Sequence, residues 1–387
     1  MGKAEGEPNV EAQGNAACER KHFMNRKGAR RRHIRRCWMI EGLDSLEYSL
    51  ARYGANTPQL GFDARTPAEA RSWQSRLRRR LIQLQGGFLA RKCDLAPQVI
   101  GRGQMGGYSR EEIVFWSRPG LRVCGYFLLP AGFRAPGPAI LCLHGHGRGA
   151  DDIVGIEPDG RQRTEWSGYQ KDFALQAVAH GCAALAIEQL GFGRRRDERA
   201  RKAGPGKSSC SPAAGAALLL GETMIGWRTY DAVRAVDYLL TRPEVDASRI
   251  GVLGISGGGT TALHVAAVDT RIALAYVSGY FSTYRDTLFS LPNCICDYIP
   301  TILRYAEMYD VAGLIAPRPF FAESGDADPL APVPATRKAF ARLREIYRAF
   351  EAQDRVALHI FRGDHQFDGT RGWRFVKRHL KRRSERA

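Results

Sequence analysis

The residues with the clearest chemical potential surround one serine. The segment Gly254-Ile255-Ser256-Gly257-Gly258 follows the apolar run Ile250–Ile255 and leads directly into the apolar, helix-like stretch Gly258–Val268. A strand, a Gly-x-Ser-x-Gly turn and a helix in this order are typical of a nucleophile elbow, in which flanking glycines let the serine occupy a strained turn. The N-terminus of the helix then directs its positive end toward developing negative charge. We therefore predict that Ser256 is a nucleophile.

A serine nucleophile at neutral pH needs a base, and histidine commonly serves. In enzymes with this type of elbow, the histidine follows the acid along the chain and lies in a loop after a late strand. Of the three histidines beyond position 330, His359 lies inside the expected strand Val356–Phe361, and His379 lies on an expected terminal helix. His365 directly follows that strand, and this position predicts that His365 is the base.

The imidazole in turn needs an orienting carboxylate from the loop after the preceding strand. We expect that strand at 319–323, and the loop after it contains both Asp326 and Asp328. Asp364 is adjacent to His365, but the side chains of these two neighbours are expected to point apart. The residues alone leave Asp326 and Asp328 as alternatives, and the unused aspartates are expected to form turns beside Gly or Pro.

Two N–H donors must face the oxyanion of a tetrahedral intermediate. One is expected from the backbone of Gly257, the residue after the nucleophile, and the other from the loop after an earlier strand. The apolar run Ala139–Leu143 leads into His144-Gly-His146-Gly at that place. Two histidines two residues apart could suggest a metal site, but the sequence offers no third ligand nearby. Backbone donation by His146 is the favoured interpretation.

The cysteines indicate neither a disulfide framework nor a metal site. Nine cysteines, an odd number, are scattered over the whole chain. Cys142 and Cys182 lie in apolar runs and are expected to pack as small hydrophobes. Cys294-Ile-Cys296 is too tight and too isolated for zinc, which would need a second pair of ligands. We therefore expect no bound metal and no cofactor.

The elements around these residues predict one α/β domain. Short apolar runs alternate with helix-like segments from Ala139 to Leu380. Continuous apolar strands that alternate with helices indicate a mostly parallel sheet covered on both faces. Two runs on either side of Pro119-Gly120 predict an antiparallel hairpin at one edge of the sheet. Before them, apolar residues spaced by three or four from Trp73 to Leu84 predict a helix.

Together, these motifs resemble the dienelactone-hydrolase-like α/β hydrolases that are often labelled acetyl xylan esterases. The resemblance spans about residues 68–380 and is carried by segments that occur in the family's order: Leu141–Gly147, Gly221–Leu240, Arg249–Thr261, Cys294–Leu314 and Ala316–Pro332. It implies an α/β-hydrolase fold with an N-terminal helical extension.

The resemblance also implies roles for particular residues. Ser256 would be the nucleophile and His365 the base, and the acid of the family lies just before a Pro-hydrophobic pair, which matches Asp328. The residue after the His-Gly pair, His146, would contribute to the oxyanion hole. Dienelactone hydrolase itself uses a cysteine nucleophile, whereas this chain has Ser256, so lactone chemistry is not implied.

The domain boundaries follow from composition and from the motifs. We expect a disordered basic tail over 1–40, a helical extension over 41–110, a catalytic domain over 111–380 and a basic tail over 381–387. The net charge of +18 is concentrated at the ends, because residues 1–40 hold 10 Lys and Arg against 4 acids and residues 371–387 hold 8 against 1. Solvated ends are the preferred interpretation, because no nucleic-acid-binding motif accompanies the charge.

The leading hypothesis is a serine hydrolase that cleaves carboxylic esters through an acyl-enzyme, with small acyl esters as substrates and acetylated carbohydrates as one candidate class. A peptidase or amidase of the same fold is one alternative. A polyanion-binding protein with an inactive hydrolase fold is another. We expect a small-molecule ester as partner, no specific nucleic acid and no membrane. The absence of an apolar export signal or spanning segment predicts a cytoplasmic protein.

Overall fold

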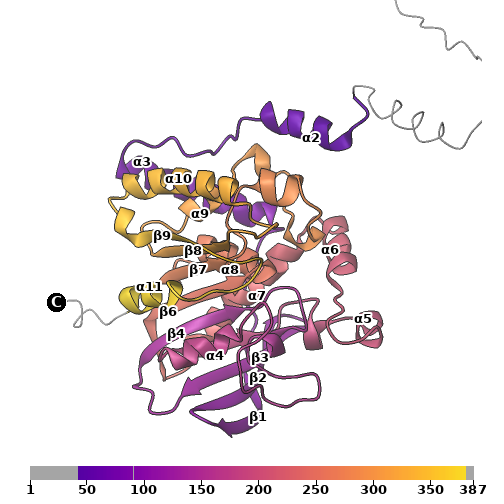
Figure 1. Cartoon of the computed structure of the whole chain (residues 1–387), viewed down its shortest axis with the longest axis vertical. Coiled ribbons are helices and arrows are strands. Elements are labelled where there is room, and N and C mark those ends of the chain that lie inside the picture. The colour runs from indigo at the N-terminus through magenta and orange to yellow at the C-terminus, as the bar shows by residue number, and fades with distance from the viewer. Residues whose placement is uncertain (1–41, 90, 381–387) are drawn as a thin grey trace, which may run out of the picture. The chain divides into compact units, whose positions relative to one another are not determined.

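The computed structural model describes residues 42–89 and 91–380. Internal contacts divide the chain into residues 1–48 and residues 49–387, and the sheet and the candidate site lie in the second unit. The centre of this unit is one sheet of nine strands (Figure 1). The strands are β1 Gln98–Met105, β2 Tyr108–Arg118, β3 Leu121–Pro130, β4 Gly137–Leu143, β5 Ala183–Ile187, β6 Val245–Ile255, β7 Leu274–Ser278, β8 Phe320–Gly325 and β9 Val356–Phe361.

The strand order across the sheet is β1-β2-β3-β5-β4-β6-β7-β8-β9. The first three strands and the β3–β5 pair are antiparallel, whereas all pairs from β5 to β9 are parallel. Because β4 to β9 are parallel, the loops that follow their carboxyl ends meet at one edge of the sheet, where ligands bind in open α/β sheets.

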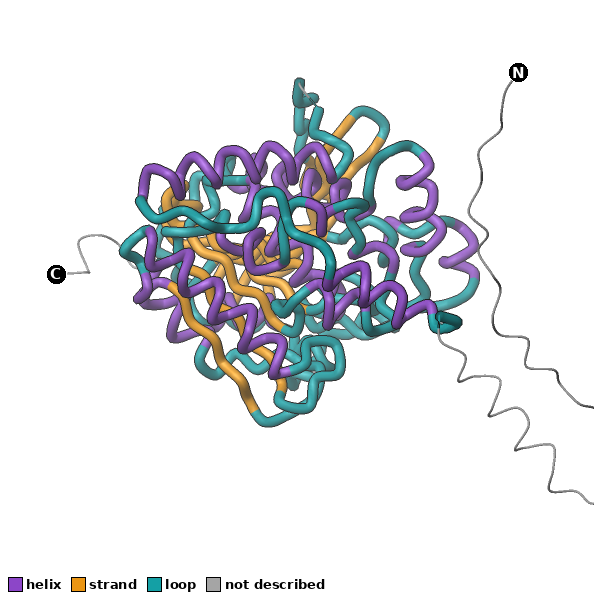
Figure 2. The backbone as a smooth tube through the Cα atoms, turned by 90° about the horizontal axis from the view of Figure 1, so that it is seen from above, coloured by secondary structure: helices purple, strands orange, loops and turns teal. Residues whose placement is uncertain are grey.

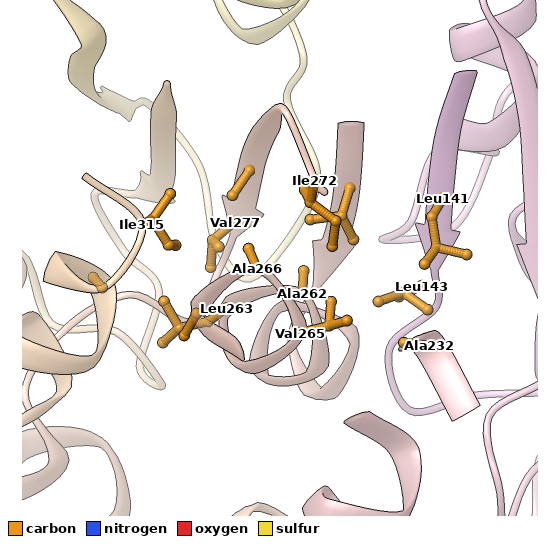
Figure 3. Close-up of a cluster of buried hydrophobic side chains, with 14 of the residues drawn as sticks. Leu141, Leu143, Ala232, Ala262, Leu263, Val265, Ala266, Ile272, Val277 and Ile315 are labelled. Atoms are coloured by element: carbon orange, nitrogen blue, oxygen red, sulfur yellow. The ribbon is translucent and has the colours of Figure 1, made fainter. Parts of the chain in front are cut away.

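The parallel strands are buried on both faces. Along β4, Leu141 and Leu143 belong to one hydrophobic core, and the alternate residues Ile140 and Cys142 belong to a second. The first core is built against α7 (Met224–Leu239) and α8 (Gly257–Val268), and Figure 3 shows its side chains between the strands and α8. The second core is built against α4 (Phe173–Ala179) and α11 (Gly372–His379). Figure 2 shows the helices on both sides of the strands, as the apolar runs predicted.

The helices connect successive strands or extend the chain at its ends. None of the described helices is both long and apolar enough to span a bilayer. Their bounds are α2 Ser45–Gly54, α3 Pro67–Leu84, α4 Phe173–Ala179, α5 Glu198–Lys202, α6 Cys210–Leu219, α7 Met224–Leu239, α8 Gly257–Val268, α9 Met308–Gly313, α10 Val333–Ala349 and α11 Gly372–His379.

The helix predicted from Trp73 to Leu84 is confirmed as α3. A capping box at Thr66 and Glu69 and a proline at its first position begin this helix, and Trp73 is buried on its inner face. The helical extension expected over 41–110 contains α2 and α3, but residues 98–105 form the edge strand β1, which was not expected. Gly101, Gly103 and polar neighbours give β1 little strand propensity, and the strand is held by pairing with β2. The tails expected at 1–40 and 381–387 lie outside the described residues.

Candidate active site and sulfur cluster

Ser256 lies in the sharp turn between β6 and α8. Its backbone has φ 57° and ψ −128°, in the positive-φ region that few non-glycine residues occupy. The amide of Ser256 donates to the carbonyl of Ser278 at the end of β7, at 3.0 Å, and its own carbonyl accepts from Thr260 N in α8, at 2.9 Å. Strand and helix therefore hold the serine in a strained conformation, which is the arrangement that the glycine-flanked motif predicted.

Glycine is required around this turn because the backbone packs too closely for a side chain. A Cβ atom at Gly258 would lie 1.9 Å from the carbonyl oxygen of Leu143, and one at Gly254 would lie 2.1 Å from the carbonyl oxygen of Gly258. At Gly145, a Cβ atom would lie 3.0 Å from Cβ of Ser256. The loop after β4 therefore passes directly beside the serine.

His365 and Asp328 form a hydrogen-bonded pair. The Nδ1 atom of His365 lies 2.9 Å from Oδ2 of Asp328, whose side chain is fully buried. Among the described residues, Nε2 of His365 is buried without a hydrogen-bond partner. A Cβ atom at Gly279, one residue after Ser278, would lie 3.0 Å from Cε1 of His365. The pair therefore lies beside the end of β7, where the carbonyl of Ser278 accepts the hydrogen bond from Ser256 N.

The other acidic candidates have different positions. Asp326 is exposed, and its Oδ1 accepts a hydrogen bond from Gly363 N at 2.9 Å, which links the loops after β8 and β9. Asp364 is also exposed. Asp328 is thus the aspartate that the structure pairs with His365. His359 on β9 instead lies 3.3 Å from Asp368.

The two residues expected to supply the oxyanion N–H groups are neighbours. A Cβ atom at Gly257 would lie 3.0 Å from both Nδ1 and Cε1 of the His146 ring. Buried Gln170 supports the loop after β4, because its Oε1 accepts from Gly145 N at 2.7 Å. His144 does not share a site with His146: its Nε2 accepts from Gln189 N at 3.0 Å and lies 3.2 Å from Glu188 Oε1.

Tyr169 is a site residue that sequence reasoning missed, because it lies in a long loop without a motif. Its hydroxyl donates to the carbonyl of His146 at 2.6 Å and, like Cβ of Ser256, packs against Gly145, where an added Cβ atom would lie 2.2 Å from the hydroxyl. Its ring stacks on His365, with centroids 5.6 Å apart and planes 24° apart. Burial raises the pKa of the Tyr169 hydroxyl far above its usual value, so the side chain is neutral and can donate a proton in a hydrogen bond.

Four potential metal ligands, one of which is the side chain of His146, lie close together. We call His146, Cys210, Cys294 and Cys296 the sulfur cluster; one ligand atom from each lies within 4.8 Å of all the others. Nε2 of His146 is 3.6 Å from Sγ of Cys296. The expectation that Cys294-Ile-Cys296 lacks a second pair of ligands is therefore wrong. Cys210 stands more than 80 residues away in the sequence, so no local spacing could reveal it.

Charge is concentrated in the sulfur cluster. Hydrogen bonds from Cys294 and Cys296 hold the pKa of Cys210 far below its usual range, and burial opposes this shift only in part. Burial lowers the pKa of His146, but hydrogen bonds to Cys210 and Cys294 outweigh it and raise that pKa to about 10. Fully buried Arg228 in α7 donates from Nη2 to Sγ of Cys210 at 2.9 Å. A buried guanidinium thus contacts the sulfur of Cys210.

A cavity borders the segment that carries Cys294 and Cys296 of the sulfur cluster. It holds about 680 Å³. Ile295, which lies between Cys294 and Cys296, contributes to its wall, as do Tyr298 and Tyr284, whereas Ser256, Asp328 and His365 do not. The cavity therefore lies beside the sulfur cluster, and the His365–Asp328 pair does not line it.

The sequence profile of the Abhydrolase family matches residues 55–363. That span contains Ser256 and Asp328 and ends two residues before His365. The chain belongs to the Abhydrolase family. The protein named "Putative hydrolase YtaP" of Bacillus subtilis (strain 168) is similar in sequence. It is 30% identical over 239 residues, and the match covers 59% of this chain and 73% of the relative.

Solved structures share the fold of this Abhydrolase family member. A "putative acetyl xylan esterase" of Bacteroides fragilis has a TM-score of 0.71 at 22% identity, over 84% of each chain. A glucuronoyl esterase of Solibacter usitatus has a TM-score of 0.58 at 18% identity, over 80% of this chain and 93% of its own. At these identities the likeness concerns the fold, and the predicted α/β-hydrolase architecture is confirmed.

Proposed function

We propose that this protein is a serine hydrolase of carboxylic esters that works through an acyl-enzyme. The observation that carries the proposal is the 2.9 Å contact between His365 and Asp328, formed beside the strand end that holds Ser256 in its strained turn. A serine after β6, a buried aspartate after β8 and a histidine after β9, in this chain order, are typical of an α/β-hydrolase that carries out nucleophilic acyl transfer.

Each residue then has a defined role. Ser256 Oγ attacks the ester carbonyl while Nε2 of His365 takes its proton, and Asp328 holds the imidazole in the tautomer with Nδ1–H and stabilises the imidazolium. The backbone N–H groups of Gly257 and His146 would receive the oxyanion. His365 returns the proton to the leaving alcohol, and a water molecule, deprotonated by His365, then releases the acid and restores Ser256.

Esters of small acyl groups are the proposed substrates, and acetylated carbohydrates are one class to test. Support for this class comes from the names of the structural neighbours, which are carbohydrate esterases on the same fold. The amide bond of a peptide is a harder substrate for the same machinery and stays the alternative within this fold.

A covalent probe tests the nucleophile directly. A fluorophosphonate should label the full chain at Ser256, as located by peptide mass spectrometry, and nitrophenyl acetate should be hydrolysed. Ser256→Ala should abolish labelling and lower turnover by about 10³-fold or more, with an unchanged circular dichroism spectrum. Labelling at another serine, or undiminished turnover by the variant, would reject the proposal. A panel of nitrophenyl esters from acetyl to octanoyl, run beside acetylated sugars, then ranks the acyl groups.

A further inference from the structure

We infer that the sulfur cluster of His146, Cys210, Cys294 and Cys296 is a structural zinc site that fixes the oxyanion loop. Three thiolates and one imidazole are a common ligand set of closed, four-coordinate zinc sites in proteins. Binding at these residues does not depend on the proposed function; only the predicted effect on ester turnover does.

The spacing of the ligand atoms fits a tetrahedral ion. With Zn–S near 2.3 Å and Zn–N near 2.0–2.1 Å, tetrahedral geometry separates two sulfurs by about 3.8 Å and a sulfur from a nitrogen by about 3.6 Å. Nε2 of His146 and Sγ of Cys296 are 3.6 Å apart, and all four ligand atoms lie within 4.8 Å of one another. Small side-chain rotations would therefore complete the coordination.

The charges around the cluster independently favour a bound dication. Arg228 is buried, no carboxylate of the described chain lies within ion-pair distance of it, and its Nη1 has no hydrogen-bond partner there. An unpaired buried cation is costly. Three thiolates with one Zn²⁺ carry a net charge of −1, which the Arg228 guanidinium neutralises across its 2.9 Å contact with Cys210. The buried carboxylate of Asp297, beside Cys296, is the other acidic group that acts on Arg228 and His146.

The surroundings suit a closed site rather than a catalytic metal. Phe192, Met224 and Ala214 form an apolar cluster with Cys210 and Cys296, which excludes water and strengthens metal–ligand attraction. All four positions are taken by protein atoms, so no position is open for substrate, in contrast to catalytic zinc. Soft thiolate ligands select zinc over magnesium or calcium.

The site joins three segments that are distant in the chain. His146 lies in the loop after β4, and Cys210 begins α6. Cys294 precedes and Cys296 lies within the short 3-10 turn Ile295–Asp297, which packs against α6, α7 and α8. The backbone of His146 is also the proposed oxyanion donor. A metal on its side chain would therefore fix the N–H group in front of Ser256, and loss of the metal would mainly lower kcat.

Metal content is the decisive measurement. The full chain, produced in zinc-supplemented medium and purified without chelators, should contain about one zinc per chain by inductively coupled plasma mass spectrometry. Cys210→Ser and Cys294→Ser should each lose most of it, whereas the control Cys93→Ser, at a partly exposed cysteine outside the cluster, should retain it. Zinc-free wild-type protein would overturn the inference, as would a zinc content unchanged by both cluster variants.

A second measurement keeps the test valid if a variant fails to fold. Wild-type protein, stripped by a chelator and refilled with Co²⁺, should show thiolate-to-cobalt charge transfer and the intense visible bands of tetrahedral coordination; their absence would overturn the inference. Mass spectrometry of the unreduced chain that finds a disulfide within the cluster would also contradict it. Zinc without ester turnover would reject the proposed function alone, and turnover by zinc-free native enzyme would reject the metal site alone.

Discussion

Tyr169 connects the two halves of the candidate site: its ring stacks on His365, and its hydroxyl donates to the carbonyl of His146 at 2.6 Å. One side chain thus contacts the proposed base and the proposed oxyanion loop, and its hydroxyl packs against Gly145 beside Ser256. Any movement of Tyr169 would disturb all three.

Removal of the Tyr169 hydroxyl should slow catalysis without removing the ring contact. In Tyr169→Phe, the carbonyl of His146 loses its donor, and an unsatisfied buried carbonyl costs about 1–3 kcal/mol. We expect kcat for nitrophenyl acetate to fall about tenfold, with a small change in KM, because the loop and the serine lose alignment while the substrate surface remains. Steady-state kinetics checks this, and Tyr169→Leu, which also removes the stacking, should be worse. Equal activity of Tyr169→Phe and wild type would contradict the positioning role.

The two aspartates of the loop after β8 should differ sharply. Asp328→Asn should lower kcat by about 10⁴-fold, because an amide cannot hold the imidazole in the productive tautomer or stabilise its cation. Asp326→Asn is the matched control: the amide oxygen can still accept from Gly363 N, so kcat should stay within about threefold. The reverse ranking in the same ester assay would assign the acid to Asp326.

Sequence and structure agree where local pattern determines the answer. The elbow at Ser256 and the position of His365 after β9 follow from strand–turn–helix periodicity, and both stand where predicted. The choice of Asp328 over Asp326 needed the family resemblance, because both lie in one polar loop and two residues of register separate them. Tyr169 and Cys210 could not be found, because they reach the site through long loops whose paths depend on tertiary packing. The strand β1 was missed for a related reason: its pairing with β2, rather than its own composition, makes it a strand.

The close backbone contact behind the elbow should make Gly258 intolerant of any side chain. In Gly258→Ala, the new Cβ atom would meet the carbonyl oxygens of Leu143 and His144 at 1.9 and 2.6 Å, and neither backbone segment can move without displacing β4. We expect the free energy of unfolding to fall by more than about 4 kcal/mol, or no soluble protein. Gly215→Ala in α6, where a Cβ atom meets nothing within 4 Å, should instead be neutral or stabilising by up to about 1 kcal/mol. Urea unfolding of the two variants compares them; similar stabilities would contradict the packing argument.

Glu323 should make stability depend on pH. This carboxyl at the end of β8 is fully buried, and burial raises its pKa from 4.5 to about 7, although hydrogen bonds from Tyr276, Asp368 N and Ser278 lower it in part. Between pH 4.5 and 7 the unfolded chain has lost this proton and the folded chain still holds it. The stabilisation is therefore complete below pH 4.5 and is lost as the pH rises through 7, by at most about 1.4 kcal/mol per pH unit.

Glu323→Gln should remove that part of the pH dependence. The amide cannot titrate, so the free energy of unfolding of the variant, measured by urea denaturation from pH 4.5 to 8, should decline less steeply than that of wild type. Asp172 and Asp310, whose pKa values burial raises to about 6, contribute equally to both proteins and cancel in the comparison. The absolute stability of the variant is not the readout, because the amide also changes the hydrogen bonds to Tyr276 and Ser278. Parallel curves for the two proteins would show that Glu323 is already ionised in the folded state, held by its four donors from β7 and the loop after His365.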